Sequence, residues 1–395
     1  MILAAPRTAL TALLSLTLAA LASGTEPIAT PWGQIVPAAA PGTYDFVVAQ
    51  WPADRQLVVP AGFPPIVRAT AESAGSRRDL VFEYNADATR VAIVAQPDTP
   101  DTPDRVTVET AEETTQFPDG RIVLTARSAK VNGTRAKLES HPGNDRIGSW
   151  ASAQDAVEWT QPLTRWGAYD LRLTYSTASP SGTEIELTVG ATKLAATLES
   201  TGSWYRYTTI PLGRVTIPAT GDLPVNVRCT KLVGDAVMNL KAVSLVPACE
   251  GTPPTQADDG SVTLHGRDAT VRGTTLRWEP AEQKQTLGFW TKPGDAAEWT
   301  FTLTTPGTFD VEVLQGCGPG QGGSEMTVTV DGGTPAAATL AFTVEETAGF
   351  QDFRARTIGR VSLAGPGPHL LRVQPAKIAH AAACDIRQIR LLPAR

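Results

Sequence analysis

The sequence of 395 residues lacks the short motifs on which many catalytic and metal sites are built. It contains no HExxH, no GxSxG and no GxxxxGKS/T pattern, and its cysteines form no CxxC pair with zinc spacing. Residues Gly318–Gly323 do fit GxGxxG, but a strand-like pattern follows them instead of the helix that a dinucleotide site requires, so we interpret them as a loop. The four histidines stand alone, at His141, His265, His369 and His380. We therefore predict no catalytic residue, no metal ligand and no cofactor, and leave a structural calcium ion open.

After residue 22 the sequence has no apolar run near the ~18 residues of a membrane-spanning helix. Before it, Arg7 precedes the apolar run Ala9–Ala20, and small residues follow, which is the layout of a signal peptide cleaved after Ala22. We therefore predict a signal peptide at residues 1–22, no membrane span, and a secreted, periplasmic or cell-envelope protein. The net charge is −6 without a basic block, which argues against nucleic acid and anionic membranes as partners.

Helical spacing of apolar residues is also missing, and alternation takes its place. The 31 prolines and 34 glycines are scattered between short runs rich in Val and Thr. In one such run, Ala297, Trp299, Phe301 and Leu303 fall on one face of a strand. Short alternating runs separated by Gly, Pro and Asp are typical of antiparallel β-sandwiches, so we predict an all-β fold.

Two long stretches of the sequence match each other. Residues 121–170 align without a gap with residues 261–310, at a constant shift of 140 (261 minus 121). Further on, residues 213–215 recur as residues 359–361, at a shift of 146 (359 minus 213). A match of this length indicates a repeated structural unit. We predict three antiparallel, jelly-roll-like β-sandwich domains, of which the last two are the repeat, at residues 30–117, 120–248 and 260–394.

Two segments rich in Pro and Asp have the composition of linkers. Glu250–Gly260 separates the two copies, and we predict that it forms an extended spacer. Gln96–Asp104 has a similar composition, which by itself indicates an interdomain linker. A resemblance described below replaces this interpretation with another, in which Gln96–Asp104 is a loop before a last strand at Val106–Glu109.

The cysteines are Cys229, Cys249, Cys317 and Cys384. Export permits disulfides, and four cysteines allow three pairings, among which the sequence does not choose. If Val225–Thr230 and Met238–Val246 form a hairpin, Cys229 lies opposite Met238, and Cys249 is well beyond the ~7 Å that separates the Cα atoms of a disulfide.

The repeated tryptophans are of two kinds. Trp159 and Trp299 alternate with polar residues inside strands, so we predict that they pack in the cores. Trp150 and Trp290 precede turns near a loop edge, where an exposed indole could stack on the apolar face of a sugar ring. Capping of the sandwich is the other interpretation of these two residues, and the sequence leaves both open.

Other aromatic and acidic residues complete the candidate site. Glu158 and Glu298 point away from the neighbouring tryptophans and are either solvated residues of a sheet face or acceptors for sugar hydroxyls. Trp204 and Tyr205 form an aromatic cluster in the first copy, and Phe350 takes the place of Trp204 in the second. The predicted carbohydrate-binding residues are Trp150, Glu158, Trp204, Tyr205, Trp290, Glu298 and Phe350.

The repeat resembles a known class of modules. The strings LGFWTKPGDAAEWTF, LQGCGPGQGGSEMTVTV and CDIRQIRLLP carry the resemblance, which covers both copies. They are similar to carbohydrate-binding, galactose-binding-like β-sandwich modules appended to exported bacterial sulfatases and glycosidases. The resemblance implies a glycan or polysaccharide as the ligand. The first copy departs from it at residues 176–183, which lack the glycine-rich loop.

The N-terminal segment resembles a different domain. TPWGQI (30–35), FVVAQWPADRQLVVPAG (46–62) and PDTPDTPDRVTVE (97–109) are similar to the C-terminal β-sandwich of family 29 α-L-fucosidases, over residues 30–117. In those enzymes a catalytic barrel precedes the sandwich, whereas here Thr30 follows the predicted signal peptide closely. No position matches the catalytic residues of the family, so none is carried over.

These observations together favour an exported, non-catalytic carbohydrate-binding protein. One alternative is an accessory remnant or partner subunit of an α-L-fucosidase-type glycoside hydrolase, and a glycosidase or sulfatase is an implied partner. Others are a structural or adhesive envelope protein and an enzyme of an unrecognised kind. Neither the sugar nor the oligomeric state follows from the sequence.

Overall fold

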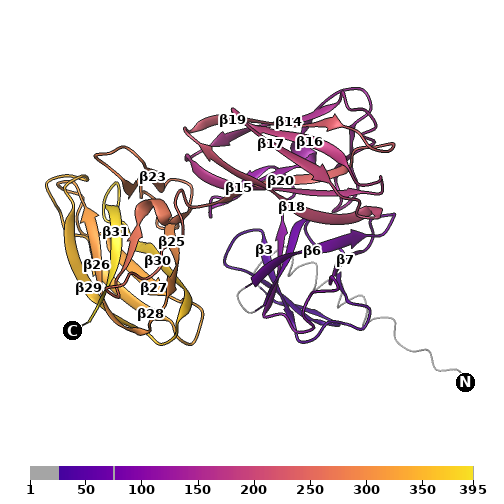
Figure 1. The fold of residues 1–395 in the computed structure, drawn as a ribbon. Helices are drawn as coiled ribbons and strands as arrows, with labels where there is room; N and C mark the ends of the chain where they lie inside the picture. Colours follow the sequence, from indigo (N-terminus) through magenta and orange to yellow (C-terminus); the bar gives the residue numbers. More distant parts are fainter. Residues whose placement is uncertain (1–25, 74–75, 395) are drawn as a thin grey trace, which may run out of the picture.

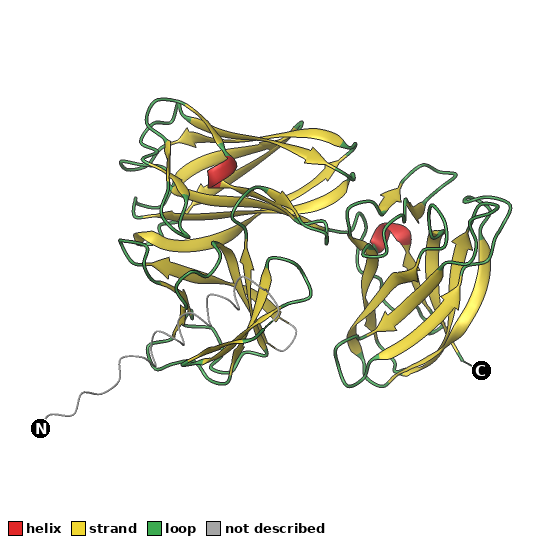
Figure 2. Cartoon of the chain, turned by 180° about the vertical axis from the view of Figure 1, so that it is seen from behind, coloured by secondary structure: helices red, strands yellow, loops and turns green. Residues whose placement is uncertain are grey.

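The computed structural model describes residues 26–73 and 76–394, which form an all-β structure (Figures 1 and 2). The helical elements among these residues are two 3-10 turns, η1 (Ala126–Ser128) and η2 (Gly266–Asp268). The predicted all-β class is confirmed. The predicted signal peptide lies outside the described residues, and within them no helix is long and apolar enough to cross a membrane.

The N-terminal part of the chain forms two connected sheets around one hydrophobic cluster, which includes Trp32, Phe46 and Phe82. One sheet has the order β1-β2-β3-β8-β5-β6, and β7 and β4 continue from β6 in the other. The strands are β1 (Ile28–Thr30), β2 (Gly33–Pro37), β3 (Thr43–Val48), β4 (Gln56–Val59), β5 (Ile66–Ser73), β6 (Ser76–Tyr84), β7 (Val91–Val94) and β8 (Arg105–Thr110).

Strand β8 decides between the two interpretations of Gln96–Asp104. It begins at Arg105 and pairs with both β3 and β5, in the middle of the N-terminal sheet. The segment Gln96–Asp104 is therefore a loop within this part of the fold, and its interpretation as an interdomain linker is wrong. Composition misled here because Pro and Asp are equally common in loops and linkers.

The middle and C-terminal parts have the same order of elements, except that β9 has no counterpart in the C-terminal part. The middle part contains β9 (Thr115–Gln116), β10 (Ile122–Thr125), β11 (Lys130–Asn132), β12 (Lys137–Glu139), β13 (Arg146–Gly148), β14 (Ala156–Leu163), β15 (Gly167–Thr177), β16 (Thr183–Val189), β17 (Thr192–Leu198), β18 (Ser203–Ile217), β19 (Gly221–Lys231) and β20 (Asn239–Pro247). The C-terminal part contains β21 (Val262–His265), β22 (Thr270–Arg272), β23 (Arg277–Glu279), β24 (Thr286–Gly288), β25 (Ala296–Leu303), β26 (Gly307–Gly316), β27 (Glu325–Val330), β28 (Ala338–Thr343), β29 (Arg354–Leu363), β30 (Gly367–Lys377) and β31 (Asp385–Pro393).

Each of these two parts encloses its own hydrophobic cluster between two antiparallel sheets. One sheet has the order β11-β14-β19-β16-β17 in the middle part and β22-β25-β30-β27-β28 in the C-terminal part. The facing sheet contains β13, β20, β15 and β18, and correspondingly β24, β31, β26 and β29. Alternating side chains enter the clusters, as in β16, where every second residue is buried. The exact domain bounds stay a prediction.

The repeated Trp and Asp residues have structural roles. Trp159 and Trp299 are 4% and 0% exposed, and their indole N–H groups donate to the carbonyls of Thr125 and His265, so their predicted core positions are confirmed. Asp155 is buried, and its carboxylate accepts the backbone N–H groups of residues 134, 135 and 136. Its counterpart Asp295 accepts those of residues 274, 275 and 276. Each aspartate thus fixes the equivalent loop of its own part.

The structure settles two connections that the sequence left open. Strands β19 and β20 do not form a hairpin, because β19 pairs with β14 and β16 while β20 pairs with β10, β13 and β15 in the facing sheet. Glu250–Gly260 is not a free spacer either. Thr255 forms a parallel bridge with Thr302, and the Gln256 side chain accepts the backbone N–H groups of Thr304 and Thr305. These hydrogen bonds hold the segment against the C-terminal part.

A continuous sheet joins the N-terminal and middle parts. Strand β6 pairs with β18, with Glu83 opposite Arg206 and Phe82 opposite Tyr207. Figure 1 shows β6 and β18 side by side where these two parts meet. Tyr207 is fully buried there, and its ring stacks on that of Phe82 with a centroid distance of 5.3 Å. The two parts therefore share backbone hydrogen bonds and a buried aromatic contact.

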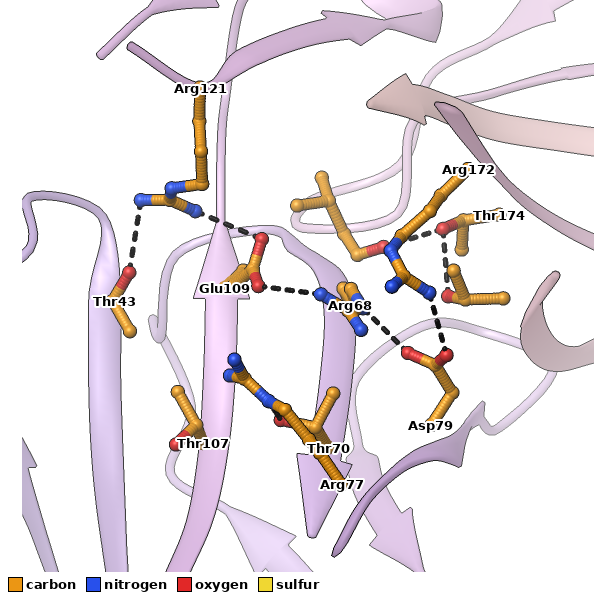
Figure 3. A network of polar contacts seen from close by, with 12 residues as sticks. Thr43, Arg68, Thr70, Arg77, Asp79, Thr107, Glu109, Arg121, Arg172 and Thr174 are labelled. Atoms are coloured by element: carbon orange, nitrogen blue, oxygen red, sulfur yellow. Dashed lines mark hydrogen bonds and ion pairs between the residues drawn. The ribbon is translucent and has the colours of Figure 1, made fainter. Parts of the chain in front are cut away.

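Buried ion pairs reinforce this junction (Figure 3). From the N-terminal part, Arg68 donates to Asp79 at 2.5 Å and to Glu109 at 3.2 Å. From the middle part, Arg121 donates to Glu109 at 2.9 Å and Arg172 to Asp79 at 3.1 Å. Burial by itself would raise the pKa of Glu109, but the guanidiniums around it lower that pKa below its ordinary value. The carboxylate is therefore ionised in the folded protein.

The middle and C-terminal parts are also in direct contact. Arg165 is 2% exposed, and its Nε donates to the carbonyl of Gly273 at 3.0 Å. The indole of Trp166 donates to the carbonyl of Trp278 at 2.9 Å. The guanidinium of Arg277 lies 4.1 Å from the Trp166 ring centroid. A buried arginine that donates across the boundary fixes how the two parts sit together.

We expect Glu109→Ala to lower the free energy of unfolding by about 3–5 kcal/mol, because two buried arginines lose their shared carboxylate. Urea unfolding followed by tryptophan fluorescence measures this change. Asp101→Ala is the matched control, since Asp101 pairs with Arg55 at the surface with its side chain 80% exposed, and should cost at most about 1 kcal/mol. Equal losses in the two variants would contradict a stabilising role for the junction network.

Candidate functional site

A recess of about 290 Å³ lies in the middle part beside its junction with the N-terminal part. Its lining comes from four chain segments, so the fold assembles it from residues far apart in the sequence. Glu139 ends β12, Arg146 begins β13, and Asn239 begins β20. Trp204 and Tyr205 stand at the start of β18. The remaining residues of the lining are Ser149, Trp150, Ala236 and Met238.

A charged pair forms the polar side of the recess. The Arg146 Nη2 and Glu139 Oε2 atoms lie 2.8 Å apart, and Ser149 donates to Glu139 Oε1 at 2.7 Å. The Arg146 side chain is only 8% exposed, and its Nε–H is buried without a hydrogen-bond partner among the described residues. Gly148 stands between the polar groups, where an added Cβ would lie 2.7 Å from Glu139 Oε2 and 2.8 Å from Asn239 Oδ1.

Two aromatic residues form the other side. Trp204 and Tyr205 are partly exposed, and the Trp204 carbonyl accepts hydrogen bonds from Ser176 and Asn239, both at 2.8 Å. The guanidinium of Arg146 lies 5.8 Å from the Tyr205 ring centroid. Tyr205 also packs against the hydrophobic cluster of the N-terminal part. The neighbouring domain junction thus helps to position the aromatic side of the recess.

A buried lysine supports the loop that carries Arg146. Lys241 is 3% exposed, and its Nζ donates to the carbonyl of Gly143 at 3.0 Å and to Asn144 Oδ1 at 3.3 Å. Burial lowers the pKa of Lys241 to about 7, although the charge of Asp145 opposes this change. Lys241 therefore connects the junction beneath Tyr84 to the loop before Arg146.

Of the two interpretations of Trp150 and Trp290, the exposed indole is excluded, so their inclusion among the predicted carbohydrate-binding residues is wrong. Both residues are 0% exposed, and their indole N–H groups donate to the carbonyls of Ser152 and Asp295. A sugar cannot stack on a ring that protein atoms cover on both faces, so the alternative interpretation, in which these residues cap the sandwich, describes them. Trp150 lies under the recess as part of its lining.

Glu158 and Glu298 do not line the recess. Glu158 lies on the sheet that contains β14, where its Oε2 is 3.7 Å from Lys130 Nζ and its Oε1 accepts a hydrogen bond from the Asn226 amide. Glu298 forms ion pairs with Arg272 and Arg372 on the corresponding C-terminal sheet. Burial raises the pKa of Glu298, but the two arginines outweigh it and lower the pKa below its ordinary value. Each of the two glutamates is thus engaged by neighbouring side chains.

The equivalent end of the C-terminal part has different chemistry. Phe350 is partly buried and packs on Gly318, where an added Cβ would lie 2.9 Å from the phenyl ring. Glu279 pairs with Lys284 at 2.5 Å, and Asp385 occupies the strand position that Asn239 has in the middle part. Gly288 lies against both carboxylates, since its added Cβ would be 2.4 Å from Glu279 Oε2 and 3.1 Å from Asp385 Oδ1.

The pKa of Asp385 is raised to about 7. Its 5% exposure is the largest cause, and the negative charge of Glu279 adds to it. In the middle part the amide Asn239 replaces this carboxyl, and Arg146 replaces Thr286 as the neighbour. The recess of the middle part therefore contains a guanidinium and an amide, whereas the equivalent place in the C-terminal part contains the carboxyl pair Glu279 and Asp385.

Six residues of the lining were not predicted from the sequence, and three of them have charged or amide side chains. These three are Glu139, Arg146 and Asn239, which come from three strands. Glu139 recurs as Glu279 in the internal alignment, and this recurrence was a usable signal. The recess combines hydrogen-bond donors and acceptors with partly exposed aromatic rings, which suits a polar ligand with an apolar face. Within the described residues no group of three or more His, Cys, Asp or Glu could hold a metal ion.

Comparison with solved structures finds carbohydrate-binding modules. Similarity to a family 35 carbohydrate-binding module from Clostridium thermocellum covers 32% of this chain and 96% of that chain, at 16% identity and a TM-score of 0.28. For a family 35 module from Cellvibrio japonicus the coverage is 32% and 92%, at 18% identity and a TM-score of 0.27. A Paenibacillus xanthan lyase matches over 94% of this chain and 36% of that chain, at 15% identity and a TM-score of 0.30.

At these TM-scores no residue role is carried over to this chain. No protein-family model matches the sequence, and no curated protein is significantly similar to it. The residues of the recess therefore have to be judged by their own geometry.

We expect Asp385→Asn to stabilise the protein at pH 8 but not at pH 4. The folded pKa of about 7 is above the unfolded value, so the stability contributed by protonated Asp385 is lost as the pH rises through 7. The gain at pH 8 should be on the order of 2–4 kcal/mol in urea melts. Asn fits this strand position, because Asn239 occupies its equivalent.

Asp310→Asn is the control, because Asp310 forms a surface ion pair with Arg360 and its pKa is lowered. It should give no gain at pH 8. A gain from Asp385→Asn that is the same at pH 4 and pH 8 would show that Asp385 is not protonated near neutral pH.

Proposed function

We propose that this chain is an exported, non-catalytic protein that binds a glycan in the recess of the middle part. The observation that carries the proposal is the recess itself, where the rings of Trp204 and Tyr205 border the Glu139–Arg146 pair. A sugar presents C–H groups on one face and hydroxyls at its rim. Aromatic rings can stack on the C–H face, and a carboxylate with a guanidinium can form hydrogen bonds with the hydroxyls.

The size of the recess indicates how much sugar it holds. Its volume of about 290 Å³ is at the small end of ligand pockets, which span roughly 300–1,000 Å³. It therefore has room for one sugar unit, either a chain end or a side branch. Glu139 is already engaged by Arg146 and Ser149, an arrangement that presents its oxygens as fixed hydrogen-bond acceptors. Fixed polar groups of this kind favour recognition of one hydroxyl pattern.

Domain organisation and cellular context form part of the same proposal. The chain consists of a signal peptide (1–22), a domain like the C-terminal sandwich of family 29 α-L-fucosidases (30–117), and two copies of a carbohydrate-binding-like module (120–248 and 260–394). The matching element order of the last two parts supports the repeat. A protein of this kind acts outside the cytoplasm, beside a glycosidase or sulfatase that acts on the same glycan.

A glycan array with the purified protein tests this proposal, followed by affinity electrophoresis on the best ligand. We expect Trp204→Ala to weaken retention about tenfold or more, because the sugar loses its stacking surface. Glu139→Gln should weaken it as well, since the amide accepts hydrogen bonds less strongly and releases Arg146.

Phe353→Ala is the matched control, a partly buried aromatic residue in the C-terminal part, and it should leave retention unchanged. Thermal melts of all variants separate a loss of binding from a loss of folding. If no glycan binds, or if folded Trp204→Ala and Glu139→Gln bind like the wild type, the proposed site is wrong.

A further inference from the structure

Two cysteines of the C-terminal part lie opposite each other on neighbouring strands. Strand β26 pairs with β31, and their last paired residues are Gly316 and Asp385. In an antiparallel pair the next residue of one strand faces the preceding residue of the other, so Cys317 stands opposite Cys384. Both are buried, at 0% and 1% exposure, within the same hydrophobic cluster. Both side chains therefore project from the same face of the strand pair into the core.

The backbone around Cys317 brings the two side chains close. Its N–H donates to the Thr347 hydroxyl at 3.0 Å, and its carbonyl accepts from the Thr347 N–H at 2.8 Å. Both polar groups thus turn away from β31, which makes Cys317 and Cys384 a pair without hydrogen bonds between them. Such pairs have the shorter Cα separation in antiparallel sheets, ~4.5 Å, which lies within the ~4.4–6.8 Å range of disulfides.

The other two cysteines are not placed to compete. Cys229 lies opposite Ile185 in the five-stranded sheet of the middle part, two residues before β19 ends. Cys249 follows the far end of β20, a strand of nine residues, and its thiol donates to the carbonyl of Gly251. Cys229 and Cys249 are therefore separated by most of the length of a sandwich. A bond from Cys229 to Cys317 would have to join two separate cores, and Cys249 lies outside both of them.

In the middle part, neither of the positions equivalent to Cys317 and Cys384 is a cysteine. There the last residues paired between β15 and β20 are Ser176 and Asn239, so the equivalent opposed residues are Thr177 and Met238. Both are buried, so the fold tolerates two residues here that cannot form a disulfide. At these two opposed positions one copy has two cysteines and the other has none, which is the pattern expected of residues that act as a pair.

We propose that Cys317 and Cys384 form a cross-strand disulfide in the mature protein. The two thiols lose two protons and two electrons as the S–S bond forms, and a disulfide oxidant such as oxidised glutathione is reduced to two thiols. The bond connects the glycine-rich loop after Gly316 to the start of β31. It thereby holds Gly318 against Phe350 at the loop end of the C-terminal part.

The thiol environment indicates when this bond forms. Burial raises the pKa of Cys317 to about 11, and that of Cys384 is raised well above its ordinary value. Thiolates are the reactive species, so exchange in the folded protein is slow. The disulfide therefore forms while the chain folds, when the thiols are still accessible to an oxidant.

The test refolds the reduced, denatured full-length protein by dilution into a buffer of reduced and oxidised glutathione. Free thiols are then alkylated, and non-reducing peptide mapping locates the crosslink. We expect two free thiols, at Cys229 and Cys249, and one crosslinked peptide pair that contains Cys317 and Cys384. The melting temperature should be roughly 5–15 °C higher than in dithiothreitol.

Two variants serve as controls. The double variant Cys317→Thr and Cys384→Met copies the pair found in the middle part, and its melting temperature should not respond to oxidation. The double variant Cys229→Ser and Cys249→Ser should respond like the wild type. A crosslink that involves Cys229 or Cys249, or four free thiols after refolding to a native melting transition, would overturn the proposal.

Discussion

The pairing of β6 with β18 is the contact on which the proposed site depends. It places the strand that carries Trp204 and Tyr205 against the core of the N-terminal part, where Tyr207 stacks on Phe82. Buried charges reinforce the same boundary, because Glu109 joins arginines from both sides. A carboxylate in such a position stabilises the folded state only while both partners remain. The two parts therefore act as one unit in which the recess is held from two sides.

The recess combines polar side chains held in fixed positions with one buried donor that has no partner within the described structure. Glu139 is held in place by Arg146 and Ser149, and Lys241 donates hydrogen bonds to the loop before Arg146. The Nε–H of Arg146 has no partner within the described structure, although the residue is almost fully buried. A buried donor without an acceptor costs free energy, and a bound ligand or an ordered water would recover it. The C-terminal end has a carboxyl at Asp385 instead, so the two ends are not equivalent as binding sites.

Local sequence patterns predicted the strands and the core tryptophans, since alternation fixes which face of a strand is buried. Trp299 follows this rule. Alternation says nothing about residues that precede a turn, and for that reason the sequence left both the burial and the exposure of Trp150 and Trp290 open. The recess could not be predicted either, because Asn239 meets the Glu139–Arg146 pair only through the pairing of β13 with β20, 93 residues further along the chain (239 minus 146). Non-local pairing of this kind also explains why composition alone indicated a linker at Gln96–Asp104, which is the loop before β8.

The central claim is that a glycan occupies the recess beside the N-terminal junction. Hydrogen–deuterium exchange, measured with and without the best ligand from the glycan array, tests it most directly. Bound sugar should slow exchange in the segments 146–150, 203–206 and 236–239, which carry the lining, and leave the C-terminal part unchanged. Slowed exchange confined to another surface, or no change at saturating ligand, would contradict the account.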